Sequence, residues 1–348
     1  TITPPASYVG TLSLVATVFN AETVLGGAEV DTSDNTNSAS DGLCLTWKPV
    51  CNPPSITVNN GVDDVVVKED GSVFVKIVAS LGAGDGNEVL SVKVTGIDPS
   101  WTITNADGTY NAATGTWTIT LPAGTNYNGG LTFAPPHNSD LDLSGLVASA
   151  SAYDPDGGGT QVATDGFNVI VDAVADKPVI DAQEISGNQG TTLAVNITAA
   201  VTDLDGSESI TGYKISGVPT GFAFNHGTNL GGGVWEFTPA QITGLTITPP
   251  LSYVGTLNLV ATVFNAETAL GGAEVDLSDN TNSASDALCL TWKPVCQPPA
   301  ITVEDACVKE DGSVFVAISA QHSAGALATE YLKVTVTGIA AGWTITNA

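Results

Sequence analysis

The sequence predicts an all-β fold made of tandem immunoglobulin-like β-sandwich domains. The first observation is composition: Gly, Thr, Val, Asn and Asp are abundant, Met is absent, and no window sustains helical periodicity. Such a composition is typical of strands joined by many turns. The second observation is an internal repeat, and the third is a series of short alternating strands. At about 100–150 residues per domain, 348 residues suggest two or three domains.

One segment near the start of the chain is repeated in its last third. "TITPPASYVGTLSLVATVFNAETVLGGAEV" begins at residue 1, and "TITPPLSYVGTLNLVATVFNAETALGGAEV" begins at residue 246. Residues 1–50 and 246–295 differ only at positions 6, 13, 24, 32 and 42 of the first copy. "VKEDGSVFVKI" at 67–77 also returns, as "VKEDGSVFVAI" at 308–318. Repeats of this kind indicate an array of similar domains.

A weaker repeat sets the domain boundaries. Residues 52–177 and 178–295 share one order of segments: a Pro-hydrophobic start, a turn before a β run, an acidic loop, a Trp strand, a "GLTFAPP" or "GLTITPP" strand and a final strand pair. That order gives about seven strands per unit, the spacing of a sandwich. We therefore expect two whole domains at 52–177 and 178–295. Residues 1–50 would be the C-terminal half of a third domain, and 298–348 the N-terminal half of a fourth.

The alternation in "SVFVKIVA" and "TWTITL" puts one face of each strand inward and the other outward. A half-sandwich leaves strand edges unpaired. We therefore expect the sequence to be either part of a longer array or a subunit whose ends are completed by neighbours. The start, "TITPPASYVG", already has the character of strand and turn, and no signal peptide is recognised in it.

The charge balance restricts the partners. There are 9 Lys and Arg residues against 36 Asp and Glu residues, which gives a formal charge of −27. Phosphate binding needs basic side chains, so nucleic acid is not expected as a partner. Cations are favoured, because they relieve the self-repulsion. No apolar run approaches the roughly 20 residues of a membrane-spanning helix, so membrane insertion is not expected.

Acidic residues gather in segments that an immunoglobulin-like fold brings to the junction near residue 177. A hard cation with six to eight oxygen ligands would suit such a cluster, and Ca2+ tolerates irregular geometry. The alternative is that Asp-Gly segments are ordinary turns. The candidate Ca2+ ligands are Glu69, Asp70, Asp172, Asp176, Asp203, Asp205, Glu208 and Glu267.

A second, weaker candidate set lies at the other end of domain 52–177. Its members are Asp85, Glu88, Asp154 and Asp156. The linker that enters this domain supplies no acid, which makes a cation site there the weaker prediction.

The segment "CLTWKPVC" occurs twice, at 44–51 and 289–296. Two cysteines with six residues between them can close a small loop in an oxidising exterior, so disulfides are predicted for Cys44 with Cys51 and for Cys289 with Cys296. Zinc is a poorer alternative, because no second Cys pair or His lies near in sequence. Cys307 is left over.

The cysteine linker follows a domain in which Asn188 and Gln189 stand where Glu69 and Asp70 stand in the other domain. We therefore expect calcium to reinforce one junction and a disulfide the next.

The sequence carries no catalytic signature. There is no Gly-x-Ser-x-Gly elbow, phosphate loop or His-Glu-x-x-His motif. Its paired carboxylates fall in turns, without aromatic residues to hold a sugar. Trp101, Trp117, Trp235 and Trp343 alternate with other residues in strands, where core packing is expected. A non-enzymatic protein is predicted.

The combined segments resemble the repeated immunoglobulin-like (cadherin-like) extender domains of giant bacterial RTX-type adhesins and biofilm-associated surface proteins. The resemblance rests on "VTDLDGSESI", "ISGVPTGFAF", "GGGVWEFTPAQITGLTITPP", "KEDGSVFVKI", "YDPDGG" and "VIVDAVADKP", and it covers nearly the whole chain. It implies an extracellular stalk at the bacterial cell surface that binds calcium between neighbouring domains. The Gly-Gly-x-Gly-x-Asp nonapeptides of the RTX β-roll are absent.

Two alternatives stay open. One is a subunit of an extracellular filament, assembled head-to-tail by strand complementation between adjacent subunits. However, joining the two terminal fragments would omit a stretch equivalent to 226–245. The other is a carbohydrate-binding module, which would need an exposed aromatic platform that the sequence does not identify.

Overall fold

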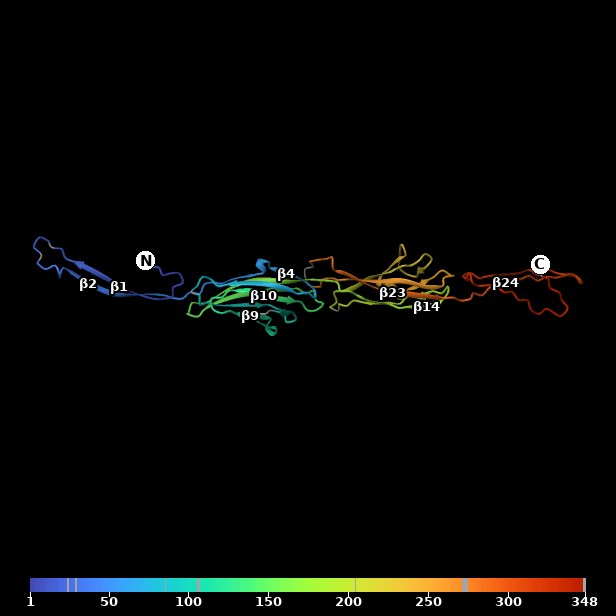
Figure 1. Ribbon diagram of the computed structural model, residues 1–348, viewed down its shortest axis with the longest axis horizontal. Coiled ribbons are helices and arrows are strands. Elements are labelled where there is room, and N and C mark those ends of the chain that lie inside the picture. Colours follow the sequence, from blue (N-terminus) through green and yellow to red (C-terminus); the bar gives the residue numbers. More distant parts are fainter. Residues whose placement is uncertain are drawn as a thin grey trace. The chain divides into compact units, whose positions relative to one another are not determined.

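The computed structural model describes residues 1–23, 25–28, 30–84, 86–104, 107–203, 205–270 and 275–346. It divides into two compact units. The first unit comprises residues 1–173 and 269–277, and the second comprises 174–268 and 278–348. Strands build both units (Figure 1). The predicted all-β class of tandem immunoglobulin-like sandwiches is confirmed.

The first unit contains one complete sandwich of two sheets. The four-stranded sheet has the order β3-β5-β10-β7 and the six-stranded sheet the order β4-β12-β11-β6-β9-β8. All pairings are antiparallel except that of β4 with β12. The elements are β3 (Ser55–Val58), β4 (Asp64–Lys68), β5 (Val73–Ser80), β6 (Val89–Thr95), β7 (Thr102–Thr104), β8 (Thr109–Asn111), β9 (Thr116–Thr120), β10 (Tyr127–Ala134), β11 (Leu143–Asp154) and β12 (Gly159–Asp172), with 3-10 turns at Asn59–Gly61 and Ala112–Thr114.

The core of this sandwich lies between the two sheets. In β5 the buried residues alternate with outward-facing ones, as the period of two predicts. Val75 and Ile77 on β5 belong to the same buried cluster as Leu90 on β6 and Trp117 on β9. Trp101 is buried as well. The predicted inward face of "SVFVKIVA" is therefore confirmed.

The second unit repeats the plan. A six-stranded sheet has the order β14-β23-β22-β17-β20-β19, and it faces the two-stranded sheet β13-β16 and the three-stranded sheet β15-β21-β18. β14 runs parallel to β23. The elements are β13 (Val179–Ala182), β14 (Ile185–Asn188), β15 (Leu193–Ala194), β16 (Ile197–Ala200), β17 (Ser209–Ser216), β18 (Ala223–Phe224), β19 (Thr228–Gly231), β20 (Val234–Phe237), α1 (Pro239–Ile242), β21 (Thr246–Thr248), β22 (Gly255–Ala266) and β23 (Thr281–Lys293).

The second core is separate from the first. It includes Ile215 on β17, Phe237 on β20, Val263 on β22 and Trp292 on β23. Trp235 packs against its margin. Both cores fall inside the ranges 52–177 and 178–295, although the domain boundaries themselves stay predictions.

The two terminal segments form small sheets. β1 (Gly10–Ala21) pairs with β2 (Thr36–Trp47) as an antiparallel hairpin in the first unit, and β24 (Ala300–Val303) pairs with β25 (Ile318–Gln321) in the second. Many of their large apolar side chains are exposed, among them Phe19 in β1 and Trp343 beyond β25. Core packing was predicted for Trp343, but its side chain is 77% exposed, so this prediction is wrong. In the described part of the chain, none of the helices has the length and hydropathy that a bilayer crossing requires.

The repeat allows one residue to be tested in two environments. Leu288 on β23 is 0% exposed, whereas the equivalent Leu43 on β2 is 45% exposed. We predict that Leu288→Ala lowers the free energy of unfolding of the second sandwich by about 2–5 kcal/mol, because it leaves a cavity. Leu43→Ala should cost less than about 1 kcal/mol. Urea unfolding of both variants measures the difference, and equal losses would contradict the assignment of these faces.

Candidate metal centre

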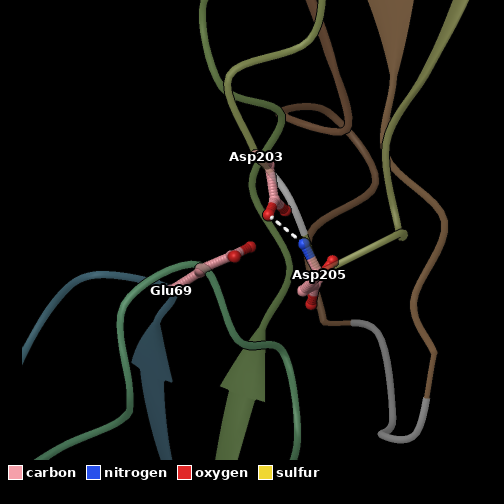
Figure 2. A group of neighbouring side chains, drawn as sticks. All are labelled: Glu69, Asp203 and Asp205. Atoms are coloured by element: carbon pink, nitrogen blue, oxygen red, sulfur yellow. Dashed lines mark hydrogen bonds between the residues drawn. The ribbon is translucent and has the colours of Figure 1, made fainter.

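The loop between β16 and β17 is folded by its own acidic side chains. The backbone N–H of Asp205 donates to Oδ1 of Asp203 (2.9 Å; Figure 2), and that of Ser207 donates to Oδ1 of Asp205 (2.8 Å). The Ser207 hydroxyl donates to Oδ2 of Asp203 (2.9 Å). Aspartates stabilise such turns by bonding to the backbone two residues on. Local sequence thus holds the carboxylate of Asp203 in a buried position.

Two glutamates of the second unit are buried beside this loop. Glu267 is 6% exposed, and neither oxygen of its carboxylate has a hydrogen-bond partner among the described residues. Oε1 of Glu208 accepts from the backbone N–H of Asp176, whereas its Oε2 is buried without a partner. A buried carboxylate without a partner is costly, because it loses its hydration and gains nothing in return.

The raised pKa values of the two glutamates reflect this cost. Burial above all, together with the neighbouring charges of Glu208, Asp203 and Asp205, raises the pKa of Glu267 to about 7, although the nearby Ser207 hydroxyl opposes part of the shift. Burial also raises the pKa of Glu208, while the backbone N–H of Asp176 and the nearby Asn265 amide oppose that shift. The cluster therefore resists holding all its negative charges at once.

Asn265 is a further member of this cluster that the sequence analysis missed. It is 1% exposed, its Nδ2 donates to the backbone oxygen of Asp176 (2.7 Å), and its Oδ1 has no partner among the described residues. The signal that could have found it is its place in "FNAET", two residues before Glu267, which the repeat duplicates at 19–23.

These donors fit a hard cation. Carboxylate oxygens of Asp203, Glu208 and Glu267 and the amide oxygen of Asn265 are the ligand types that Ca2+ takes, and a divalent charge would offset the buried negative charge. Asp205 lies in the same loop, and the backbone N–H of Asp176 donates to Glu208, so the second unit holds five of the eight predicted ligands.

The first unit holds the other three, Glu69, Asp70 and Asp172. The turn after β4 is closed where the backbone N–H of Glu69 donates to the backbone oxygen of Asp172 (2.9 Å). Asp70 has a left-handed backbone (φ 57°), and its Oδ1 accepts from the N–H of Asn138 (2.9 Å) and lies 3.1 Å from Nδ1 of His137. Asp70 therefore has a structural role in its own unit.

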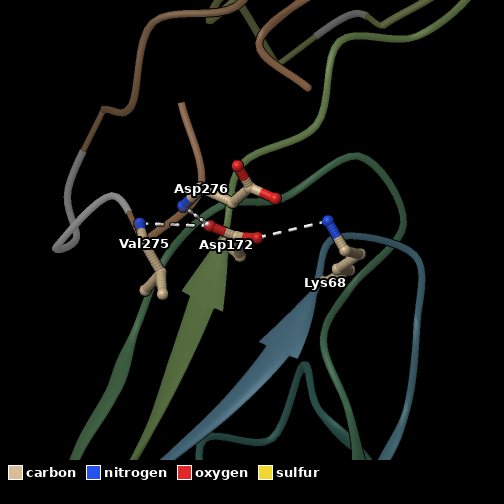
Figure 3. A network of polar contacts seen from close by, with 4 residues as sticks. All are labelled: Lys68, Asp172, Val275 and Asp276. Atoms are coloured by element: carbon tan, nitrogen blue, oxygen red, sulfur yellow. Dashed lines mark hydrogen bonds and ion pairs between the residues drawn. The ribbon is translucent and has the colours of Figure 1, made fainter. Parts of the chain in front are cut away.

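Asp172, at the end of β12, is buried with both carboxylate oxygens engaged (Figure 3). Its Oδ2 lies 3.4 Å from Nζ of Lys68, and its Oδ1 accepts from the backbone N–H groups of Val275 (3.1 Å) and Asp276 (2.8 Å). Asp172 thus anchors the segment 275–277 of its unit.

Asp140 was missed by the sequence analysis and resembles Asp172 in position. It is 1% exposed, and its Oδ2 accepts from the backbone N–H of Leu270, while its Oδ1 has no partner among the described residues. The acidic "NSDLD" at 138–142 gave only a weak signal, because it is also an ordinary turn sequence.

The weaker set is partly assembled in the first unit. Asp154 is buried, and its Oδ1 accepts from the N–H of Asp156 (2.8 Å), whose Oδ2 accepts from Nδ2 of Asn87 (2.5 Å). Oε2 of the buried Glu88 accepts from the N–H of Gly86 (3.2 Å). Asp85 lies outside the described residues. The whole predicted ligand set, which draws on both units, stays a prediction.

The predicted disulfides are not formed. All five cysteines lie in described segments, and each is a free thiol. Cys44 is fixed in β2 opposite Ser13, whereas the thiol of Cys51 is buried and donates to the backbone oxygen of Ala152 on β11 (3.2 Å). Strand pairing and this second contact hold the two sulfurs in different surroundings, and a disulfide needs Cα atoms within about 7 Å.

The second cysteine pair is separated in the same way. Cys289 lies in β23, where its thiol donates to Oδ1 of Asn258 (3.4 Å), while the Cys296 thiol lies 3.9 Å from Oε2 of Glu330. The segment between these two cysteines forms the end of strand β23 and the chain that follows it, and does not form a small disulfide-closed loop.

Comparisons with known proteins give distant structural similarities alone. No family model and no curated protein matches the chain. Among solved structures it is similar to fibronectin type III-like modules of CbhA from Clostridium thermocellum (13% identity, 69% of this chain and 95% of that one, TM-score 0.20). It is also similar to the major pilin subunit of Bacillus cereus (9%, 83% and 99%, TM-score 0.31) and to an I-band fragment of titin (13%, 71% and 67%, TM-score 0.25).

The raised pKa of Glu267 predicts a pH dependence. Between its ordinary value of 4.5 and about 7, the folded second sandwich binds a proton that the unfolded chain releases. Its stability in chelator should therefore fall as pH rises from about 4.5 to about 7 and then level off. Glu267→Gln should flatten this part of the profile. Thermal melts between pH 4.5 and 8 measure it, and an unchanged slope in the variant would contradict the assignment.

The free cysteines predict the thiol chemistry. In denaturant without reductant, the purified chain should react with five equivalents of a thiol reagent. In the native state Cys51 should react most slowly, because its thiol is buried. Mass spectrometry after alkylation counts and locates the labels, and Cys51→Ala removes the slow phase. Three or fewer labels in denaturant would show that disulfides do form.

Proposed function

We propose that the chain is part of the stalk of a bacterial cell-surface adhesin, a non-enzymatic extracellular array that calcium stiffens. Its tandem immunoglobulin-like sandwiches suit a structural extracellular role. The resemblance to extender domains of RTX-type adhesins and biofilm-associated proteins supports the narrower assignment. The formal charge of −27 supports a role for cations.

The observation that carries the proposal is the state of Glu267. Its carboxylate is nearly fully buried, lacks a hydrogen-bond partner among the described residues and lies among other acids. A protein keeps such a group when a ligand compensates it or when it is protonated. At extracellular calcium concentrations a divalent ion is the natural compensation, and sites of 10⁻⁴ to 10⁻³ M affinity are typical of extracellular modules.

The stiffening mechanism follows from the linker. Asp172 belongs to the first unit and Asp176 to the second, so only residues 173–175 separate acids of the two units. Calcium bound by acids next to so short a linker would restrict its backbone rotation. Restricting that rotation at every junction would keep an array extended. We propose that the ligands are acids on both sides of this linker: Glu69, Asp176, Asp203, Asp205, Glu208 and Glu267.

The test is a thermal melt of the full chain in excess Ca2+ and in excess chelator, with small-angle scattering of the same samples. At about 100 times the Kd, calcium should add about 2.7 kcal/mol to the stability of the second sandwich. For a domain of this size, that shift corresponds to a Tm increase of at least about 5 °C. The scattering should report a longer, less variable particle with calcium.

Two variants make the experiment specific. Glu267→Gln should reduce the calcium-dependent rise in Tm, and Asp203→Asn together with Asp205→Asn should abolish it. Glu184→Gln is the matched control, because Glu184 is an exposed acid of the same unit in the segment between β13 and β14. A rise that is equal in all variants, or no rise in the unaltered chain, would exclude calcium at these residues and leave the acidic loops as turns.

A further inference from the structure

The second unit begins with residues 174–176, and later parts of the same unit hold the backbone of this segment. The N–H of Ala175 donates to the backbone oxygen of Asp279 (3.0 Å). The backbone oxygen of Ala175 accepts from Nδ2 of Asn282 on β23 (2.9 Å). Ala175 itself is buried. Both backbone polar groups of Ala175 are thus satisfied by residues around the start of β23.

Asp176 is held in a different way, by two buried side chains of the candidate metal centre. Its N–H donates to Oε1 of Glu208, and its backbone oxygen accepts from Nδ2 of Asn265 (2.7 Å). The other polar atom of each side chain, Oε2 of Glu208 and Oδ1 of Asn265, is buried without a partner among the described residues. Each side chain is therefore satisfied only at the end that contacts Asp176.

Asn282 is the matched case of an asparagine that is satisfied at both ends. Its Nδ2 donates to Ala175, and its Oδ1 accepts from the N–H of Ser283 (2.8 Å). Asn265 lies directly opposite Asn282 in the β22–β23 pairing. Both asparagines hold the segment 174–176, but of the two it is Asn265 that keeps a buried oxygen without a partner among the described residues.

The two unpartnered oxygens have the chemistry of cation ligands. A carboxylate oxygen and an amide oxygen are both hard donors of the kind that Ca2+ takes. Burial raises the pKa of Glu208 and the nearby Asn265 amide opposes that shift, so the two side chains are neighbours. A buried polar atom without a partner is costly, and a cation would satisfy both oxygens at once. Because the carboxylate and the amide are planar, a cation that fixes the oxygen at one end also restricts the atom at the other end.

The first sandwich gives a comparison without these asparagines. Near its entry, the N–H of Cys51 donates to the backbone oxygen of Gly158 (3.4 Å). The end of its β11–β12 hairpin, "YDPDGGGT" at 153–160, contains no asparagine, and the segment 48–54 that enters this sandwich contains no acid. The asparagine pair therefore accompanies the acidic linker at 172–176.

We propose that Asn265 and Glu208 are positioning residues that transmit cation binding to the backbone of Asp176 and so order residues 174–176. This role depends on the proposed calcium site and supplies the route by which binding reaches the linker. Coupling of this kind is reciprocal, so an ordered segment also raises the affinity for calcium. Asn282 supports the same segment without taking part in the coupling, because both ends of its amide already have partners.

The experiment measures hydrogen exchange and calcium binding on the full chain. Amide exchange of residues 174–177, followed by mass spectrometry, is compared in excess Ca2+ and in excess chelator. We expect calcium to slow this exchange about fivefold or more, the usual range of coupling between two sites. Isothermal titration calorimetry with Ca2+ alone reports the binding itself, so ordering and affinity are measured separately.

Two substitutions separate transmission from simple support. Asn265→Asp keeps an oxygen for the cation but loses the donor to Asp176, so Ca2+ should still bind while the calcium-dependent slowing of exchange falls. Asn282→Ala loses a bond to Ala175 in both conditions, so exchange should become faster by the same factor in calcium and in chelator. Asn20→Asp is the control, because it makes the same change in the repeated segment of β1, in the first unit.

Two results would overturn the coupling and leave the calcium site in place. The first is calorimetric binding of Ca2+ by the unaltered chain without slower exchange at 174–177, a result that does not depend on how any variant folds. The second is an undiminished calcium effect in Asn265→Asp, which means that calcium orders the segment by another route. If calorimetry detects no Ca2+ binding, the proposed function fails, and the coupling fails with it.

Discussion

The fold depends on covering the apolar face of one long hairpin in each sandwich. β11–β12 and β22–β23 are the longest strand pairs of the two sandwiches, and each buries its inward side chains against an opposing sheet assembled from earlier, shorter strands. Such burial contributes about 25 cal/mol per Å² of apolar surface, which makes it the largest favourable term in the sandwich. The β1–β2 hairpin shows what the same sequence does without cover: the strands pair in register, but Val18 and Leu43 stay exposed.

The acidic loops lie at the ends of the sheets, outside the packed cores. Buried carboxylates in these loops differ in whether hydrogen-bond donors surround them. Asp172 is satisfied by Lys68 and by two backbone N–H groups, so it stabilises its own unit. Glu267 is equally buried yet has no such donors among the described residues, and its pKa rises to about 7. Net charge alone does not distinguish these cases; the local supply of donors does.

The proposed cation ligands and the packed core share strand β22. Asn265 and Glu267 stand at the end of β22, where the strand leaves the core, whereas Val263 stands within the core. A cation bound at this strand end, as proposed above, would hold the β22–β23 hairpin in place within its sandwich.

The sequence by itself determined the all-β class, the alternation of buried and exposed residues in the strands, and the turn that Asp203 and Asp205 stabilise by local hydrogen bonds. These features depend on residues that are only a few positions apart. It also placed acids near residue 177. Only the tertiary structure decided that Glu267 lacks donors and that Asn265 belongs to the cluster. It likewise decided that the Cys51 thiol donates a hydrogen bond to the backbone oxygen of Ala152 on β11 and forms no disulfide with Cys44. These outcomes depend on strands that are distant in sequence and meet only through packing, which spacing along the chain does not encode.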